Sequence, residues 1–123
     1  MRLIVPVTIA LLAGCTAPPP TQTTASIPEL SGRIAGTPQR CIPFEQGESL
    51  RIAGPHSLIY GNGRVVYLNP VPQCSTLRSS DVLVLEPIGS RYCRGDFVRT
   101  RDSVSGLPGP GCRLGDFVPY TRD

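Results

Sequence analysis

Five cysteines are the residues of this 123-residue sequence whose type and spacing say most about its chemistry. Cys15 stands alone near the N-terminus, and the other four are Cys41, Cys74, Cys93 and Cys112. These four show no C-x₂-C spacing and have no histidine near them, so the pattern predicts neither a zinc site nor a redox motif. Two disulfides are the simplest account, because a small exported domain gains stability from such crosslinks.

The pairing of these four cysteines is open from the sequence, since four cysteines allow three connectivities. Local loop closure favours Cys41–Cys74 together with Cys93–Cys112, which close loops of about 33 and about 19 residues. Each disulfide would stabilise the fold by about 3–4 kcal/mol. We expect all four cysteines to be framework residues rather than catalysts.

Cys15 follows a segment typical of an exported protein. Met1-Arg2 is a short positive region, and an apolar run of about ten residues follows it, half of what a membrane span needs. The pattern predicts a signal peptide over residues 1–14. Leu12-Ala13-Gly14-Cys15 resembles the bacterial lipobox, in which the cysteine receives diacylglycerol and its amine is then acylated, for example with palmitate. Such chains hold a protein in the bilayer by about 0.8 kcal/mol per buried CH₂.

The residue after the anchor bears on which membrane holds the protein. Enterobacterial lipoproteins that stay at the inner membrane have an aspartate there, whereas this sequence has Thr16. We therefore expect a lipid anchor in the outer membrane of the cell envelope, with the domain facing the periplasm. The alternative is ordinary cleavage after a small residue such as Ala17, which leaves an unmodified cysteine or none.

Two aspartates occupy equivalent positions in an internal repeat. Residues 93–98 (CRGDFV) recur as residues 112–118 (CRLGDFV), which makes Asp96 and Asp116 counterparts. Paired carboxylates about 5–9.5 Å apart on a pocket floor could hydrolyse a glycosidic bond. An aspartate that follows glycine in a tight turn, however, ordinarily accepts a backbone N–H group. We expect that structural role for both.

The repeat also predicts an arrangement of strands. Each copy reads as a strand entered from a cysteine and a Gly-Asp turn. A Cys93–Cys112 disulfide would hold the two copies side by side. Phe97-Val98 and Phe117-Val118 would then share one face of the core.

The only histidine, His56, lies between Pro55 and Ser57 in a predicted turn. A Ser-His-Asp set can be drawn from Ser57 or Ser49 with Asp81, but no nucleophile motif supports it. We expect a solvated histidine and no catalytic residue. With one histidine and scattered acids, the sequence also predicts no metal and no other cofactor.

All 12 basic residues are arginine, and 11 of them follow the leader, against 9 acids. This small excess argues against a nucleic-acid-binding protein. Four arginines lie close together and could meet anionic lipid, glycan or peptidoglycan carboxylates: Arg91, Arg94, Arg99 and Arg101. Because Asp96 and Asp102 lie among them, a solvated strand face is the favoured interpretation.

Short β-strands must position these residues. Residues 15–40 comprise the lipidated N-terminus and a flexible Pro/Thr/Ser-rich tether, with a short helical turn between Pro28 and Arg33, and residues 41–123 form the β-rich domain. Leu58–Leu68 predicts a hairpin, and Val82–Leu85 a central strand. The sequence therefore predicts a mainly β fold, a small antiparallel sandwich or barrel-like sheet with two disulfides and little helix.

The order and spacing of these features also carry a resemblance. Cys41, the hairpin, Cys74 with Leu77, Cys93-Arg94-Gly95-Asp96 and Cys112 resemble a family of small uncharacterised exported proteins and lipoproteins of alphaproteobacteria, domains of unknown function with spaced cysteines. The resemblance covers residues 41–123. It implies export and a small β-rich fold, and it brings no known activity.

We expect a non-enzymatic, lipid-anchored envelope protein that binds or scaffolds an envelope protein or glycan. Its partners would be the membrane, through the N-terminal lipid, and this envelope partner, without nucleic acid. The alternative is a periplasmic hydrolase-like or inhibitor-like module that uses Asp96 and Asp116. A pocket that holds both carboxylates would favour the enzyme, whereas side chains turned into their own turns would favour the scaffold.

Overall fold

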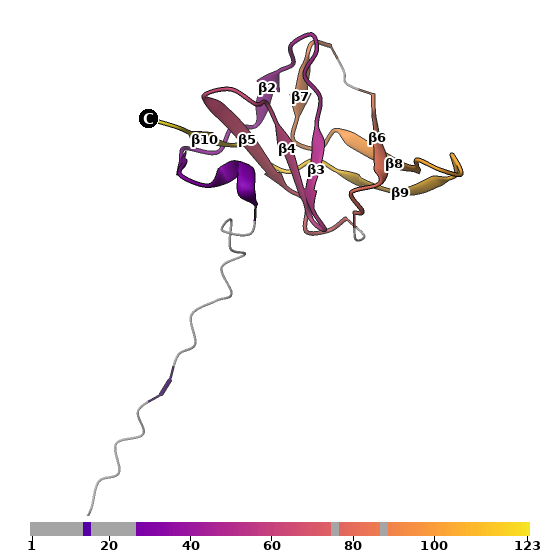
Figure 1. Ribbon diagram of the computed structural model, residues 1–123, viewed down its shortest axis with the longest axis horizontal. Coiled ribbons are helices and arrows are strands. Elements are labelled where there is room, and N and C mark those ends of the chain that lie inside the picture. The colour runs from indigo at the N-terminus through magenta and orange to yellow at the C-terminus, as the bar shows by residue number, and fades with distance from the viewer. Residues whose placement is uncertain (1–13, 16–26, 75–76, 87–88) are drawn as a thin grey trace, which may run out of the picture.

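The computed structural model describes residues 14–15, 27–74, 77–86 and 89–123 (Figure 1). These residues form a short 3₁₀ helix and ten strands: η2 (Pro28–Leu30), β1 (Ile34–Ala35), β2 (Cys41–Pro43), β3 (Arg51–Gly54), β4 (Ser57–Tyr60), β5 (Val65–Pro70), β6 (Asp81–Leu85), β7 (Arg91–Cys93), β8 (Phe97–Asp102), β9 (Pro108–Arg113) and β10 (Val118–Thr121). No helix in the described ranges has the length and apolar character to cross a membrane. The predicted leader and the tether up to residue 26 lie outside these ranges, apart from Gly14 and Cys15.

The strands form three antiparallel sheets. The largest has the order β1-β10-β5-β4-β3, the second is the pair β2-β7, and the third has the order β6-β8-β9. The mainly β, antiparallel fold with little helix is thereby confirmed, and the sheets do not close into a barrel.

The predicted hairpin is confirmed and forms the centre of the largest sheet. β4 pairs with β5, with Tyr60 opposite Tyr67. Gly61 begins the connection with a φ of 88°, and a Cβ there would meet the Val65 carbonyl oxygen at 3.1 Å. Glycine is therefore the residue that fits this turn. β5 ends at Pro70, since proline has no N–H group with which to continue the ladder.

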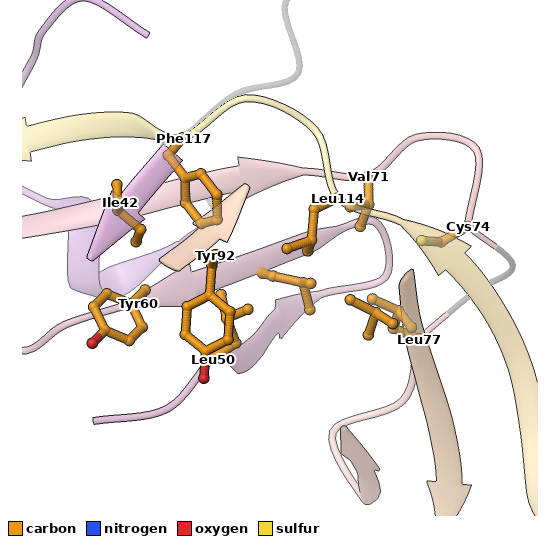
Figure 2. Close-up of a cluster of buried hydrophobic side chains, with 11 residues drawn as sticks. Ile42, Leu50, Tyr60, Val71, Cys74, Leu77, Tyr92, Leu114 and Phe117 are labelled. Carbon is orange, nitrogen blue, oxygen red and sulfur yellow. The ribbon is translucent and has the colours of Figure 1, made fainter. Parts of the chain in front are cut away.

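Strand alternation gives the largest sheet an apolar layer on each face. Leu58 and Tyr60 of β4 face the larger cluster, and Ile59 faces the smaller one. Figure 2 shows the larger cluster, with Tyr60, Tyr92 and Leu50 gathered at one end. Its buried members come from several sheets and loops, which joins the three sheets into one core: Ile42, Leu50, Leu58, Tyr60, Val71, Cys74, Leu77, Tyr92, Val98, Leu114 and Phe117.

The smaller cluster extends the domain beyond its predicted start. Ile27 and Leu30, three residues apart around η2, are buried against the face of the sheet that carries Ile59. β1 then pairs with β10 at the sheet edge. The predicted helical turn is confirmed as η2, but the placement of residues 27–40 in the tether was wrong. Two apolar side chains at helical spacing, together with the β1-β10 pairing, dock this segment on the sheet.

The favoured disulfide pairing was also wrong. The disulfides are Cys41–Cys93 and Cys74–Cys112, with sequence separations of 52 and 38 residues. Cys41 lies directly opposite Cys93 in the β2-β7 pair. Pairing of strands distant in the sequence therefore determines this connectivity, and local loop closure does not.

The strand predicted at Val82–Leu85 exists as β6, but it lies at a sheet edge instead of the centre. Leu83 and Leu85 pack against the larger cluster. Val82 and Val84 are 49% and 36% exposed, because this strand has one face toward solvent. The continuous apolar run in the sequence therefore corresponds to a strand that carries apolar side chains on both its buried face and its solvent face.

The two repeat copies do lie side by side, through backbone hydrogen bonds and not through a disulfide. The N–H of Gly95 donates to the carbonyl of Leu114 at 2.9 Å, and the N–H of Leu114 donates to the carbonyl of Asp96 at 2.9 Å. The prediction of a shared core face was wrong, since Phe97 is 41% exposed whereas Phe117 is fully buried.

Candidate functional site

The repeat aspartates have local partners. The carboxylate of Asp96 accepts the backbone N–H of Cys93 at 2.8 Å, within its own turn. The carboxylate of Asp116 lies 3.5 Å from the guanidinium of Arg94 on the surface. Asp96 therefore has the arrangement that distinguishes a structural aspartate from a member of a catalytic pair.

His56 has a structural role and is half-buried, so the prediction of a solvated histidine was wrong. Its Nδ1 lies 3.1 Å from the carbonyl oxygen of Cys74, to which it donates when it carries the proton. The carbonyl of His56 accepts the N–H of Val71 at 2.8 Å. The predicted turn is present between β3 and β4, and it positions the segment that carries the disulfide cysteine Cys74.

Asp81, the third member of the conceivable triad, is engaged elsewhere. Its carboxylate accepts the N–H of Arg78 at 3.0 Å and lies 3.6 Å from the guanidinium of the same residue. That guanidinium is also 3.7 Å from the carboxylate of Asp102, which lies opposite Asp81 in the β6-β8 pair. The three side chains border a cavity of about 360 Å³. They form an ion-pair network that ties two strands together.

Metal-ligating side chains do not form a cluster in the described ranges. Groups of three or more histidine, cysteine, aspartate or glutamate residues with metal-binding geometry are absent there. The sulfur atoms of the four domain cysteines are all used in disulfides.

The arginines predicted to cluster are separated by the fold. Arg94 pairs with Asp116, and Arg91 lies on β7 in a different sheet. Arg99 and Arg101 remain together on the solvent side of β8. Arg113 of β9, which is exposed and lies opposite Phe97, joins them there.

These residues form a mixed apolar and cationic surface on the β6-β8-β9 sheet, which we call the outer face: Val82, Val84, Phe97, Arg99, Arg101 and Arg113. Alternation along β8 places Phe97, Arg99 and Arg101 on one side, while Val98 and Thr100 are buried on the other. The register puts Val84 opposite Arg99 and Val82 opposite Arg101. Each exposed valine thus lies beside an arginine.

Phe97, the first residue of β8, is the exposed aromatic residue of this surface. The guanidinium carbons of Arg99 and Arg113 lie 5.1 and 5.8 Å from its ring centroid, within the range of cation–π attraction. Gly111 makes room for the ring, because a Cβ at that position would lie 2.5 Å from the Phe97 Cζ atom. The arrangement holds an exposed aromatic ring and two cations in one place.

The cavity found on the outer face is small. The cavity between Val84, Glu86, Phe97 and Arg99 measures about 10 Å³, which does not accommodate a small molecule. Such a surface suits a macromolecular partner. Arg99 and Arg101 were predicted to lie together, whereas Phe97 and Arg113 were not placed with them, although the alternation Phe97-Arg99-Arg101 indicates one strand face.

Comparison of the chain with protein-family models, with curated proteins and with solved structures gives no match. The resemblance to small exported proteins with spaced cysteines therefore stays a prediction.

Proposed function

We propose that this protein is a non-enzymatic, lipid-anchored protein of the bacterial cell envelope that faces the periplasm from the outer membrane. Its outer face would bind an envelope protein with an acidic surface. The observation that carries the proposal is the exposed cluster of Phe97 with Arg99 and Arg113 on the β6-β8-β9 sheet.

Composition supports a protein partner. Aromatic residues and arginine are enriched at protein interfaces and contribute much of their binding energy. The three arginines of the outer face have Glu86 as the neighbouring acid, so carboxylates of the partner would meet a cationic surface. Val82 and Val84 add apolar area beside them.

The shape of the surface supports the same choice. A glycan or small ligand is usually held in a concave site that covers most of its surface, and the cavity on this face is too small for that. An exposed surface that combines an aromatic ring with arginines is typical of a protein–protein interface.

The envelope assignment rests on the N-terminal sequence and on the crosslinks. Lipidation of Cys15 accounts for the odd cysteine, and two disulfides fit an oxidising compartment. A lipid anchor with a tether would also raise the effective concentration of the domain near partners in the same membrane.

The anchor is tested by replacing its acceptor. Cys15→Ser should prevent lipid attachment and release the protein from the membrane fraction, as unprocessed precursor or as soluble exported protein. Fractionation after a high-salt wash, with metabolic labelling by a fatty acid, measures this. Membrane retention of the variant under these conditions would contradict the anchor.

The binding surface is tested by photo-crosslinking in intact cells. A photoreactive amino acid placed at Val84 should give one discrete protein adduct, and the same probe at the exposed Gln46 should not. Arg99→Glu with Arg101→Glu should abolish the Val84 adduct, because acids replace the cations that attract the partner. Equal adducts at both positions, or a glycan adduct at Val84, would refute a protein partner at this face.

A further inference from the structure

Four arginines that are far apart in the sequence converge at one end of the largest sheet. They are Arg33, Arg51, Arg64 and Arg122, which we call the arginine cluster. The alternation of side chains between the two faces of a strand explains the convergence. Arg51 lies opposite Ile59, Arg64 is two residues before Val66, and Arg122 is two residues after Tyr120. All three are thereby on the face that η2 covers.

Short contacts hold the cluster together. The Arg33 guanidinium donates to the Arg64 carbonyl at 2.7 Å, and the Arg64 Nε donates to the Arg122 carbonyl at 3.2 Å. The Arg51 guanidinium lies 2.6 Å from the carboxylate of Glu29. Arg33, Arg51 and Arg122 line a cavity of about 430 Å³, with Glu29 on its wall. Backbone carbonyls thus position the guanidinium groups of Arg33 and Arg64 without neutralising them, whereas Glu29 pairs with that of Arg51.

The balance of charge leaves the cluster with a cationic excess. Glu29 is the acid that faces it, and Asp123 follows Arg122 in the chain, so four cations stand against two carboxylates. The N–H of Arg122 donates to the Arg64 carbonyl, which makes these two residues cross-strand neighbours. Like charges on neighbouring strands repel each other. An anion in the cavity would relieve that repulsion.

The short chain distance between the arginine cluster and Cys15 indicates which anion the cluster would meet. The described range that contains the arginine cluster starts at Ile27, directly before Pro28 and Glu29 on the cavity wall. Eleven residues lie between Cys15 and Ile27, and the twelve steps along the chain span at most about 43 Å when fully extended. A lipid at Cys15 therefore keeps this end of the domain close to the bilayer surface.

We infer that the arginine cluster binds the phosphate groups of anionic lipid headgroups in the membrane that holds the lipid anchor. One guanidinium group can donate two parallel hydrogen bonds to two oxygens of a phosphate group. Each arginine near an anionic bilayer adds to the electrostatic attraction. This inference rests on the proposed anchoring, because the anchor determines which end of the domain meets the membrane. The contact would orient the domain and leave the outer face free for its partner.

Vesicle binding without the lipid anchor tests the inference separately from the anchor itself. The chain from residue 15 onwards, carrying Cys15→Ser, retains every strand and the helix η2. It should sediment with vesicles of phosphatidylcholine and phosphatidylglycerol at low ionic strength, and not with phosphatidylcholine alone. Salt should weaken the binding, because it screens charges near a surface.

Paired variants separate the cluster from general charge. Arg64→Gln with Arg122→Gln should weaken vesicle binding about 30-fold, since each arginine near the surface contributes about a factor of five. Arg40→Gln with Arg91→Gln makes the same change of charge at exposed positions outside the cluster, and its effect should be several-fold smaller. Far-UV circular dichroism checks that both variants fold.

Two results would overturn the inference. An equal loss of binding in both double variants would mean that net charge alone attracts the protein. Displacement from the vesicles by inorganic phosphate at low millimolar concentration would identify a soluble phosphate ligand instead of a lipid headgroup. Either result leaves the Cys15→Ser fractionation unaffected, so failure of this inference and failure of the anchor are distinguishable.

Discussion

Asn69 is a buried polar side chain that replaces part of a β-ladder. Its amide nitrogen donates to the carbonyl of Gly115 at 2.8 Å, and its amide oxygen accepts the N–H of the same residue at 2.8 Å. A Cβ on Gly115 would approach the Pro70 carbonyl oxygen to 2.6 Å, so this close contact requires glycine. The pair joins β5 to the segment between β9 and β10, beside the second repeat copy.

Removing this amide should destabilise the fold. Asn69→Ala leaves the N–H and carbonyl of Gly115 without partners in a buried site, and we expect the free energy of unfolding to fall by about 2–4 kcal/mol. Urea unfolding followed by circular dichroism measures this. Asn62→Ala, at an exposed turn position, is the control and should change stability little. Equal effects of the two substitutions would contradict the role of Asn69.

Asp102 provides a prediction on pH. Its carboxylate accepts the backbone N–H groups of Ser105 and Val104, and these hydrogen bonds, with a smaller effect of Arg78, lower its pKa from the ordinary 3.8. A pKa lowered by folding adds stability above about pH 4, and this contribution is lost as the pH falls through the lowered value. Asp102→Asn should therefore lose less stability than the wild type between pH 5 and pH 2.5, in urea unfolding at each pH.

At the scale of elements, local sequence patterns predicted the hairpin and the turns. The pairing of strands that are distant in the sequence could not be predicted in this way. The hairpin around Gly61, the turn at His56 and the helical turn at Pro28 all follow from turn residues and short periodicities in the sequence. The edge position of β6 and the disulfide pairing depend on which distant strands meet. Nothing in a single short apolar run tells whether one or both of its faces are covered.

The same distinction between local patterns and distant strand pairing applies to the residues of the candidate site. Arginine spacing within β8 correctly indicated a shared face for Arg99 and Arg101, because alternation is a local property. Arg113 reaches that face through the β8-β9 register, and the arginine cluster near η2 requires the order of the whole largest sheet. These residues lie up to 89 positions apart in the sequence, from Arg33 to Arg122.

The second disulfide should make a large contribution to stability. Cys74–Cys112 joins the loop after β5 to β9 and so connects two sheets. Replacing both cysteines with alanine should cost about 4 kcal/mol, given a loop of 38 residues. Peptide mapping under non-reducing conditions first establishes the pairing, and urea unfolding then measures the loss. A Cys93–Cys112 peptide in the native protein would contradict the connectivity described here.

At the scale of the molecule, the two proposed surfaces lie at different ends. Figure 1 shows η2 and the end of β10 toward one side of the longest axis, and the β6-β8-β9 sheet toward the other. A domain held at the bilayer by the η2 end would present the outer face away from the membrane. One end would then fix the orientation while the other meets a partner.

The crossed order of the disulfides has a consequence for how the chain matures. In the reduced chain, Cys41–Cys74 and Cys93–Cys112 close shorter loops than the native pairs, which favours this non-native pairing by about 1 kcal/mol before any strands have formed. If the chain is exported from its N-terminus, Cys41 and Cys74 also meet the oxidant first. Rapid oxidation would thus trap a mispaired species, and an isomerase that reshuffles disulfides would set the yield of native protein.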